Sequence, residues 1–104
     1  ENFRLPSCTY DLLVNFYYLD RALAPQMVRA LRPDGVLVFE TFTVDQERFG
    51  WGPDRQDYLL QPGELKRLFA DLQTLHYDEG VKDSDRGHKA IASLIARKPG
   101  GGPT

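Results

Sequence analysis

The amino-acid sequence predicts an α/β fold with two parallel strands, an antiparallel pair of strands and flanking helices. Two strongly apolar segments, residues 10–17 and 36–42, lie on either side of an amphipathic helical segment, residues 24–31. A strand, a helix and a second strand in this order form a parallel pair with a right-handed crossover. Two further strand-like segments, residues 74–81 and 88–97, are separated by too few residues for a crossover helix, so they must pair antiparallel.

The first strand segment, "YDLLVNFYY" at residues 10–18, consists of Leu, Val, Phe and Tyr with only Asp11 and Asn15 between them. This composition predicts a strand that is buried on both faces, as in a parallel sheet. The following helix has Pro25 in its first turn, where the missing N–H is not needed. The Pro-Asp-Gly sequence at residues 33–35 is expected to end the helix and reverse the chain.

The second strand, "VLVFETF" at residues 36–42, is as apolar as the first, so helices are expected to cover both faces of the sheet. Residues 43–61 form a long connection that Gly and Pro interrupt, with room for a helical turn at 44–49, and connections of this length are usually functional. A helix is expected over residues 62–72, where apolar side chains recur at helical spacing.

The composition limits the class of protein. A chain of 104 residues makes one domain or a part of one, and 41% apolar with 27% charged residues is typical of a soluble globular protein. The net charge of −2 gives no electrostatic reason to expect nucleic acid or a membrane as a partner. The single Cys8 fits a cytoplasmic location. Cys8, His76 and His88 lack the spacing of a zinc site, so no metal is expected.

Several stretches, taken in order, resemble the second half of a class I S-adenosylmethionine-dependent methyltransferase. "LPSCTYDLLVNFYYLDR" is similar to the segment around that family's fourth strand, and "ALRPDGVLVFETF" resembles the turn into its fifth, with Asp34 in place of a glycine. "DYLLQPGELKRLF" resembles bacterial tellurite-resistance-type methyltransferases. The resemblance covers residues 1–98 and implies the C-terminal half of a Rossmann-like methyltransferase sheet, with the last strand, residues 88–97, between the second and the third. Residues 99–104 are expected to form a flexible tail.

The resemblance also implies that a part of the domain is missing. In the family, a glycine-rich turn after the first strand and an acidic residue after the second hold S-adenosylmethionine, the cofactor of the intact domain. No Gly-x-Gly-x-Gly precedes Tyr10, and Glu1 stands near a turn that contacts adenine in the family. The N-terminal cofactor-binding half is therefore expected to be absent from these 104 residues. We expect the chain alone to bind S-adenosylmethionine weakly or not at all and to be inactive.

The cofactor-binding residues implied by the resemblance are Asn15, Phe16 and Tyr17. Ligands of open α/β sheets bind beyond the carboxyl ends of the strands, and the family places the sulfonium of the cofactor at this position. An aromatic face suits such a cation. The alternative is that these side chains are structural. The two possibilities weigh evenly for Asn15 and Tyr17, whereas packing between helix and sheet is favoured for Phe16 and Tyr18.

The substrate-binding candidates are Glu40 and Thr41 at the end of the second strand and Arg48 and Tyr58 in the long connection. An unpaired buried carboxylate is costly, so Glu40 is expected to contact the substrate or act as a general base. The alternative for Glu40 is an ion pair with Arg48 or Arg55. No catalytic residue is assigned, because methyl transfer depends mainly on alignment and desolvation. The acceptor is expected to be a small molecule.

Two other classes of function stay open. The chain could be a truncated, non-catalytic module that associates through its sheet edge, or another α/β enzyme, although no glycine loop for phosphate is present. The strand at residues 10–18 contains no Pro, Lys or Arg to protect an edge. We therefore expect a homodimer at this strand, or pairing with a missing N-terminal half. Residues 1–9, folded back across the edge, would instead keep the chain monomeric.

Overall fold

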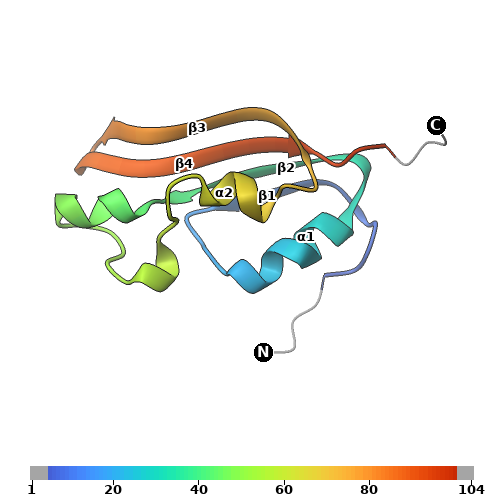
Figure 1. The fold of residues 1–104 in the computed structure, drawn as a ribbon, viewed down its shortest axis with the longest axis horizontal. Helices are drawn as coiled ribbons and strands as arrows, with labels where there is room; N and C mark the ends of the chain where they lie inside the picture. Colours follow the sequence, from blue (N-terminus) through green and yellow to red (C-terminus); the bar gives the residue numbers. More distant parts are fainter. Residues whose placement is uncertain (1–4, 101–104) are drawn as a thin grey trace.

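The structure is a computed structural model that describes residues 5–100, and it contains one mixed sheet with short helices (Figure 1). In chain order the elements are β1 (Tyr10–Phe16), the 3-10 helix η1 (Arg21–Leu23), α1 (Ala24–Ala30), β2 (Leu31–Phe42), the 3-10 helices η2 (Val44–Phe49) and η3 (Gln56–Tyr58), α2 (Glu64–Leu68), β3 (Gln73–Ser84) and β4 (Gly87–Arg97). Glu1, which is expected near a turn that contacts adenine, and residues 101–104 of the expected tail lie outside the described residues.

The sheet has the predicted topology. Its strand order is β1-β2-β4-β3, with β1 parallel to β2 and with β4 antiparallel to both β2 and β3. The parallel pair, the terminal hairpin and the position of β4 between β2 and β3 are therefore confirmed (Figure 1). The helix expected at residues 24–31 is α1. Both hairpin strands extend further toward their connecting turn than expected.

The strand β2 begins at Leu31 rather than at residue 36. Asp34 has a left-handed backbone with φ of 70°, and the pairing of β1 with β2 shifts register at this point. The Asp34 N–H donates to the Lys98 carbonyl at 2.9 Å, and the Lys98 N–H donates to the Gly35 carbonyl at 2.8 Å. The expectation that Pro-Asp-Gly reverses the chain is therefore wrong, because these bonds keep it in the sheet as an irregular part of β2.

The helix α2 spans only Glu64–Leu68, although the apolar spacing predicted residues 62–72. Its N-cap, Gly63, has φ of 72°, so the helix cannot begin before it. At the other end, the Ala70 N–H donates to the Arg67 carbonyl at 3.3 Å, which is the tighter bonding pattern of a 3-10 turn. The helical periodicity is real, but these turns limit the regular α-helix to its middle.

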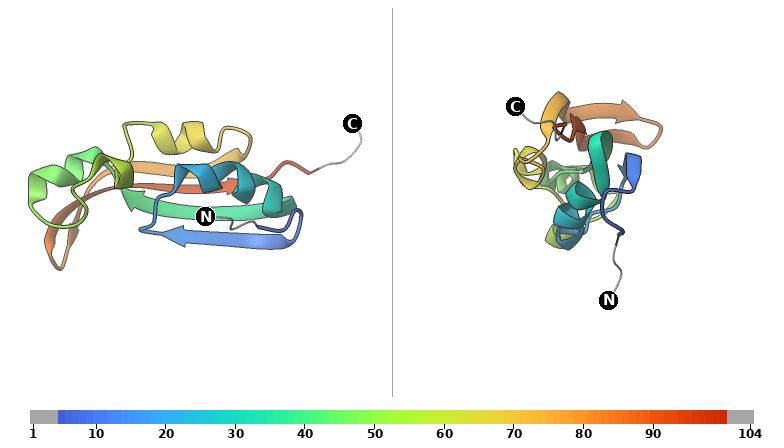
Figure 2. Two further views of the ribbon diagram at one scale, coloured as in Figure 1. Left: turned by 90° about the horizontal axis from the view of Figure 1, so that it is seen from below. Right: turned by 90° about the vertical axis from the view of Figure 1, so that its right-hand side faces the viewer.

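Both α-helices pack on one face of the sheet, where they share a single apolar core (Figure 2). The buried members of this core are Leu19, Ala24, Leu31, Leu37, Phe39, Leu60, Leu65, Phe69, Leu72, Ala92, Leu94 and Ala96. The Phe39 and Phe69 rings, from β2 and from the end of α2, lie 5.4 Å apart between centroids. The helices are thereby fixed to the middle of the sheet.

The opposite face of the sheet is exposed along β1. Leu12, Val14 and Phe16 project from this face with 56%, 52% and 54% of their surfaces exposed. We call these three residues, with Val36 and Val38 beside them on β2, the open face. The expectation that β1 is buried on both faces is therefore wrong, because α1 and α2 both cover the other face.

The outer edge of β1 has no strand partner within residues 5–100, because β1 is the first strand in the sheet order. Residues 5–9, the described part of the segment before it, do not return across this edge. Instead, the Cys8 N–H donates to the Arg29 carbonyl and the Thr9 N–H donates to the Ala30 carbonyl, each at 2.8 Å. The described residues before β1 therefore lie along the end of α1. Within the described part of the chain, no helix has the length and apolar character needed to cross a membrane.

Candidate functional site

The carboxyl ends of β1 and β2 lie side by side, since Phe16 pairs with Glu40 at the end of the parallel ladder. Ligands bind at such a position in open α/β sheets. The side chains that follow these two ends are therefore the first place to look for chemistry.

Tyr17 fastens the end of β1 to the end of β2 through two bonds to one residue. Its N–H donates to the Glu40 carbonyl at 2.7 Å, and its Oη donates to the Glu40 carboxylate. Tyr17 has φ of 60°, which is a costly conformation for a residue with a Cβ and is found preferentially at functional sites. Asn15 Nδ2 donates to the Tyr18 carbonyl at 2.7 Å. Asn15 therefore supports the turn that holds Tyr17.

The Glu40 carboxylate belongs to a chain of four side chains. Ser93 Oγ donates to Glu40 Oε1 at 2.6 Å, while Lys89 Nζ donates to Tyr17 Oη at 2.9 Å and lies 5.2 Å from the centroid of that ring. The order is Lys89, Tyr17, Glu40, Ser93. The alternative of an ion pair between Glu40 and a loop arginine is wrong, because its partners in the described chain are a tyrosine and a serine.

Two of these groups hold their protons more tightly than usual. Burial, followed by the hydrogen bond to Glu40, raises the pKa of the Tyr17 phenol. The hydrogen bond to Tyr17 raises the pKa of the Lys89 ammonium. At neutral pH the phenol therefore donates to Glu40 and accepts from Lys89, and Ser93 donates to Glu40 from the other side, so the donors of the chain converge on the Glu40 carboxylate.

We expect the free energy of unfolding to fall as the pH rises above about 10. The pKa values of Tyr17, Tyr77 and Lys89 are all raised, from ordinary values of 10.0, 10.0 and 10.5. As the pH rises, the unfolded chain releases these protons at a lower pH than the folded chain does. The folded state is therefore stabilised below the ordinary pKa values, and this stabilisation is lost as the pH rises through the raised pKa values. Urea titrations between pH 8 and 11 measure the change, and Tyr17→Phe should reduce the slope. A stability that rises over this range would contradict the assignment.

A cavity of about 280 Å³ lies next to Tyr17, at the carboxyl end of the sheet. We call it the sheet-end cavity; it is lined by Tyr17, Tyr18, Leu19, Thr41, Phe42, Pro53 and Tyr58. The fold thus brings together three residues that the sequence predicted for the site, Tyr17, Thr41 and Tyr58. Phe16 and Tyr18 are 54% and 55% exposed, so neither packs between helix and sheet.

Arg48 lies apart from these residues. It projects from η2, where its guanidinium is 5.4 Å from the centroid of the Phe49 ring. It lines neither the sheet-end cavity nor the two further cavities described below. Its role in substrate binding stays a prediction that the geometry does not support.

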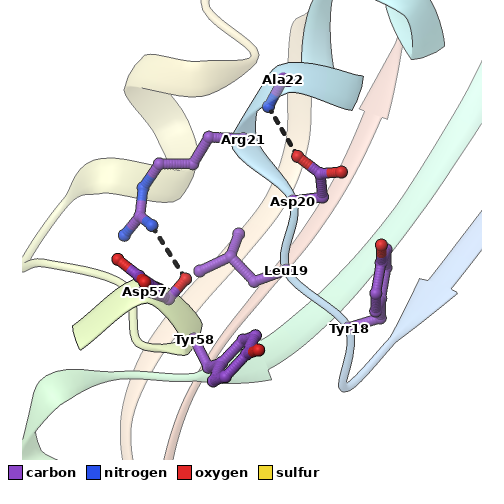
Figure 3. Close-up of a pocket in the computed structure, with 7 residues that line it drawn as sticks. All are labelled: Tyr18, Leu19, Asp20, Arg21, Ala22, Asp57 and Tyr58. Atoms are coloured by element: carbon purple, nitrogen blue, oxygen red, sulfur yellow. Dashed lines mark hydrogen bonds between the residues drawn. The ribbon is translucent and has the colours of Figure 1, made fainter. Parts of the chain in front are cut away.

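A more open cavity of about 420 Å³ adjoins the first and shares Tyr18, Leu19 and Tyr58 with it (Figure 3). Arg21 forms one side: its guanidinium donates to the Leu59 carbonyl at 2.8 Å and to the Asp57 carbonyl at 3.1 Å (Figure 3). Its other contacts are with the Glu64 carboxylate, in a two-pronged ion pair.

Through these hydrogen bonds and the ion pair, Arg21 joins the segment after β1 to the long connection and to α2. The hydrogen bond from Arg21 lowers the pKa of Glu64, whose carboxylate stays ionised at neutral pH. The long connection is thereby fastened over the ends of the strands. The sequence analysis missed this role of Arg21, because a lone arginine in a loop gives no local signal of its partners.

The two partners of the Tyr17–Glu40 pair, Lys89 and Ser93, were also missed. Both lie on β4, where their spacing places them on one face of the strand. Only the register between β2 and β4, in which Ser93 lies opposite Glu40, shows that this face is the one that carries Glu40. No three His, Cys, Asp or Glu side chains among residues 5–100 are grouped so as to hold a metal ion.

The chain resembles solved structures, although neither a family model nor a curated protein matches its sequence. A SAM-dependent methyltransferase from Methanosarcina mazei superposes with a TM-score of 0.67 at 14% identity, over 94% of this chain and 63% of that one. The N-methyltransferase NodS from Bradyrhizobium japonicum, in complex with S-adenosyl-L-homocysteine, gives 0.63 at 22% identity, over 94% and 50%. The [4+2]-cyclase SpnF gives 0.67 at 15% identity, over 96% and 53%.

These comparisons concern the fold. The chain spans between half and just under two thirds of the length of the three structures. The presence of a cyclase among them shows that this fold does not set the reaction by itself. The mixed sheet expected from the sequence is confirmed, and the chain has the fold of a part of a SAM-dependent methyltransferase.

Proposed function

We propose that this chain is the C-terminal part of a S-adenosylmethionine-dependent methyltransferase that acts on a small-molecule acceptor in the cytoplasm. The observation that carries the proposal is the Tyr17–Glu40 pair, a strained and doubly bonded junction at the carboxyl ends of two parallel strands. In this fold, NodS is a methyltransferase with S-adenosyl-L-homocysteine bound.

The residues present fit one end of such a cofactor. Tyr17 and Tyr18 are 43% and 55% exposed at the mouth of the sheet-end cavity, and aromatic faces attract a sulfonium cation. When bound, the cofactor supplies an electrophilic methyl group, whose bond to sulfur breaks as an acceptor lone pair forms the new bond. Asn15 holds the turn that orients Tyr17, while Thr41 and Tyr58 shape the cavity.

Glu40 is the proposed general base. Its carboxylate accepts the hydrogen bond of Tyr17 Oη, so a proton lost by the acceptor can pass to Tyr17 as Tyr17 gives its own proton to Glu40. The phenol ends neutral and the carboxylate ends protonated, which balances the step. Lys89 stabilises the phenol oxygen while the proton moves.

A second proposal concerns the partner of the chain. The open face and the unpaired edge of β1 favour association, since Leu12, Val14 and Phe16 form an exposed apolar row. We propose that a second copy of the chain covers this row when no complementary half of a methyltransferase domain is supplied. A dimer of this kind is also expected of a non-catalytic module. Binding of the cofactor distinguishes the methyltransferase from the non-catalytic module.

Titration of S-adenosyl-L-homocysteine into the ¹⁵N-labelled chain tests the proposed function. We expect amide shifts confined to residues 15–19 and 40–43, with an affinity weaker than micromolar because the glycine-rich turn is not in this sequence. Tyr17→Leu should remove these shifts, whereas the matched Tyr10→Leu, at the amino end of β1, should retain them. Absence of shifts at both strand ends would refute the site. Micromolar binding would overturn the assignment to the second half of the domain.

A further inference from the structure

A third cavity, of about 380 Å³, lies between the turn of the β3–β4 hairpin and the end of β2. We call it the hairpin cavity; its lining includes Tyr17, Phe42, Trp51, Asp85, Arg86 and Lys89. Its volume falls within the range of small-molecule sites, which is about 300–1,000 Å³. It meets the sheet-end cavity at Tyr17 and Phe42, which line both.

Three aromatic rings form one continuous wall of the hairpin cavity. The Tyr17 and Phe42 centroids are 5.1 Å apart, and the Phe42 and Trp51 centroids are 5.8 Å apart in an edge-to-face arrangement. Trp51 is fixed because its Nε1–H donates to the His88 carbonyl at 3.0 Å. A rigid wall of rings favours a flat aromatic ligand, which can stack or contact ring edges.

Two cations lie over this wall. The Arg86 guanidinium is 5.5 Å from the centroid of the Trp51 ring, and Lys89 Nζ is 5.2 Å from that of the Tyr17 ring. Neither takes part in any ion pair found within residues 5–100. Asp85 is the one carboxylate among the residues that line the cavity, so the lining carries an excess of one positive charge.

From this combination we propose that the hairpin cavity binds a planar aromatic carboxylate. The ring of the ligand would lie against Phe42 and Trp51, and its carboxylate would be held by Arg86 and Lys89, neither of which forms an ion pair with a carboxylate among residues 5–100. A neutral aromatic compound would leave both cations without a carboxylate partner. An inorganic anion would use the cations and leave the aromatic wall uncovered.

The same cavity assigns a chemical class to the methyl acceptor, and this second step rests on the proposed function. A ligand in the hairpin cavity would contact Tyr17, the residue that also faces the sheet-end cavity. The Tyr17–Glu40 pair would then lie within reach of a hydroxyl or amine on its ring. Acceptors of this class are aromatic acids that carry such a nucleophilic group.

The test uses the indole N–H resonance of Trp51, which is the only tryptophan of the chain and therefore gives one resolved signal. Benzoate is the probe, and benzyl alcohol, cyclohexanecarboxylate and inorganic phosphate are the comparisons. We expect a saturable shift with benzoate and affinities at least about tenfold weaker for the others, which corresponds to about 1.4 kcal/mol. Equal shifts with all four compounds, or none with benzoate, would overturn the proposal.

Charge-removing variants separate this site from a general anion effect. Arg86→Gln and Lys89→Gln should each weaken benzoate binding about tenfold, and Asp85→Asn should strengthen it about twofold. The matched control is Lys66→Gln, which removes a cation 5.5 Å from the centroid of the Tyr77 ring on another part of the sheet. A loss of affinity in Lys66→Gln equal to that in Lys89→Gln would refute the site.

The two proposals can fail separately. Benzoate binding with no response to S-adenosyl-L-homocysteine at residues 15–19 would retain the hairpin site and refute the methyltransferase function. The opposite result would retain the function and refute this acceptor class. Circular dichroism of each variant shows whether the fold is preserved, and if one of the two charge-removing variants unfolds, the other carries the test. Arg86→Lys keeps the charge and should retain most of the affinity, and an equal loss in Arg86→Lys and Arg86→Gln would contradict a role for the charge.

Discussion

Replacing Val14 with lysine is expected to convert an associated chain into a monomer. Val14 is the middle residue of the apolar row on β1 and is 52% exposed in the isolated chain. In a complex that covers the open face, the lysine ammonium would be placed in an apolar contact, which costs several kcal/mol when no partner charge is present. The dissociation constant should therefore increase about 100-fold or more.

Light scattering coupled to size exclusion at micromolar concentration measures this change. The unaltered chain is expected to elute with twice the mass of one copy, and Val14→Lys with the mass of one. Val81→Lys is the matched control, because Val81 is 45% exposed but lies on β3, at the other edge of the sheet. A stable monomer of the unaltered chain, or equal dissociation of both variants, would contradict association through the open face.

Replacing Phe69 with alanine is expected to cause the largest loss of stability among these predictions. Its ring is 2% exposed and contacts the Phe39 ring of β2, so truncation would leave a cavity where α2 is joined to the sheet. Removal of a buried Phe side chain costs about 3–5 kcal/mol, which is a large part of the stability of a small domain.

Urea unfolding followed by circular dichroism gives the change in the free energy of unfolding. Leu75→Ala is the control, because Leu75 is 52% exposed on β3 and its truncation should change the stability by no more than about 0.5 kcal/mol. A loss below about 1 kcal/mol for Phe69→Ala would show that α2 is not held by this contact.

The sequence predicted the four strands and the two pairs that they form because each strand has a strong local signal. The apolar runs of β1 and β2, and the helix between them, determine a parallel pair, and the short turn determines the hairpin. The place of β4 came from the resemblance to a family. The sequence could not show which face of β1 is covered, because Leu12 and Leu13 look alike in an apolar run and only the packing of α1 distinguishes them.

The candidate site was predicted in part for the same reason. Tyr17, Thr41 and Tyr58 were found because the carboxyl ends of the strands and the long connection are visible in the sequence. Lys89 and Ser93 were not found, because their approach to Tyr17 and Glu40 depends on the register between β2 and β4. The backbone conformation of Tyr17 also had no local signal, since tyrosine rarely adopts a positive φ.

The insertion of β4 between β2 and β3 determines when the sheet can form during synthesis. The strand that joins β1 and β2 to β3 is the last of the four strands to leave the ribosome, so the three earlier strands cannot close into one sheet before β4 has emerged. Until Arg97 has emerged, the inner edge of β2 has no antiparallel neighbour. Assembly of the sheet therefore depends on the emergence of β4, and a nascent chain that stalls within the hairpin exposes β2 on the side that β4 would cover.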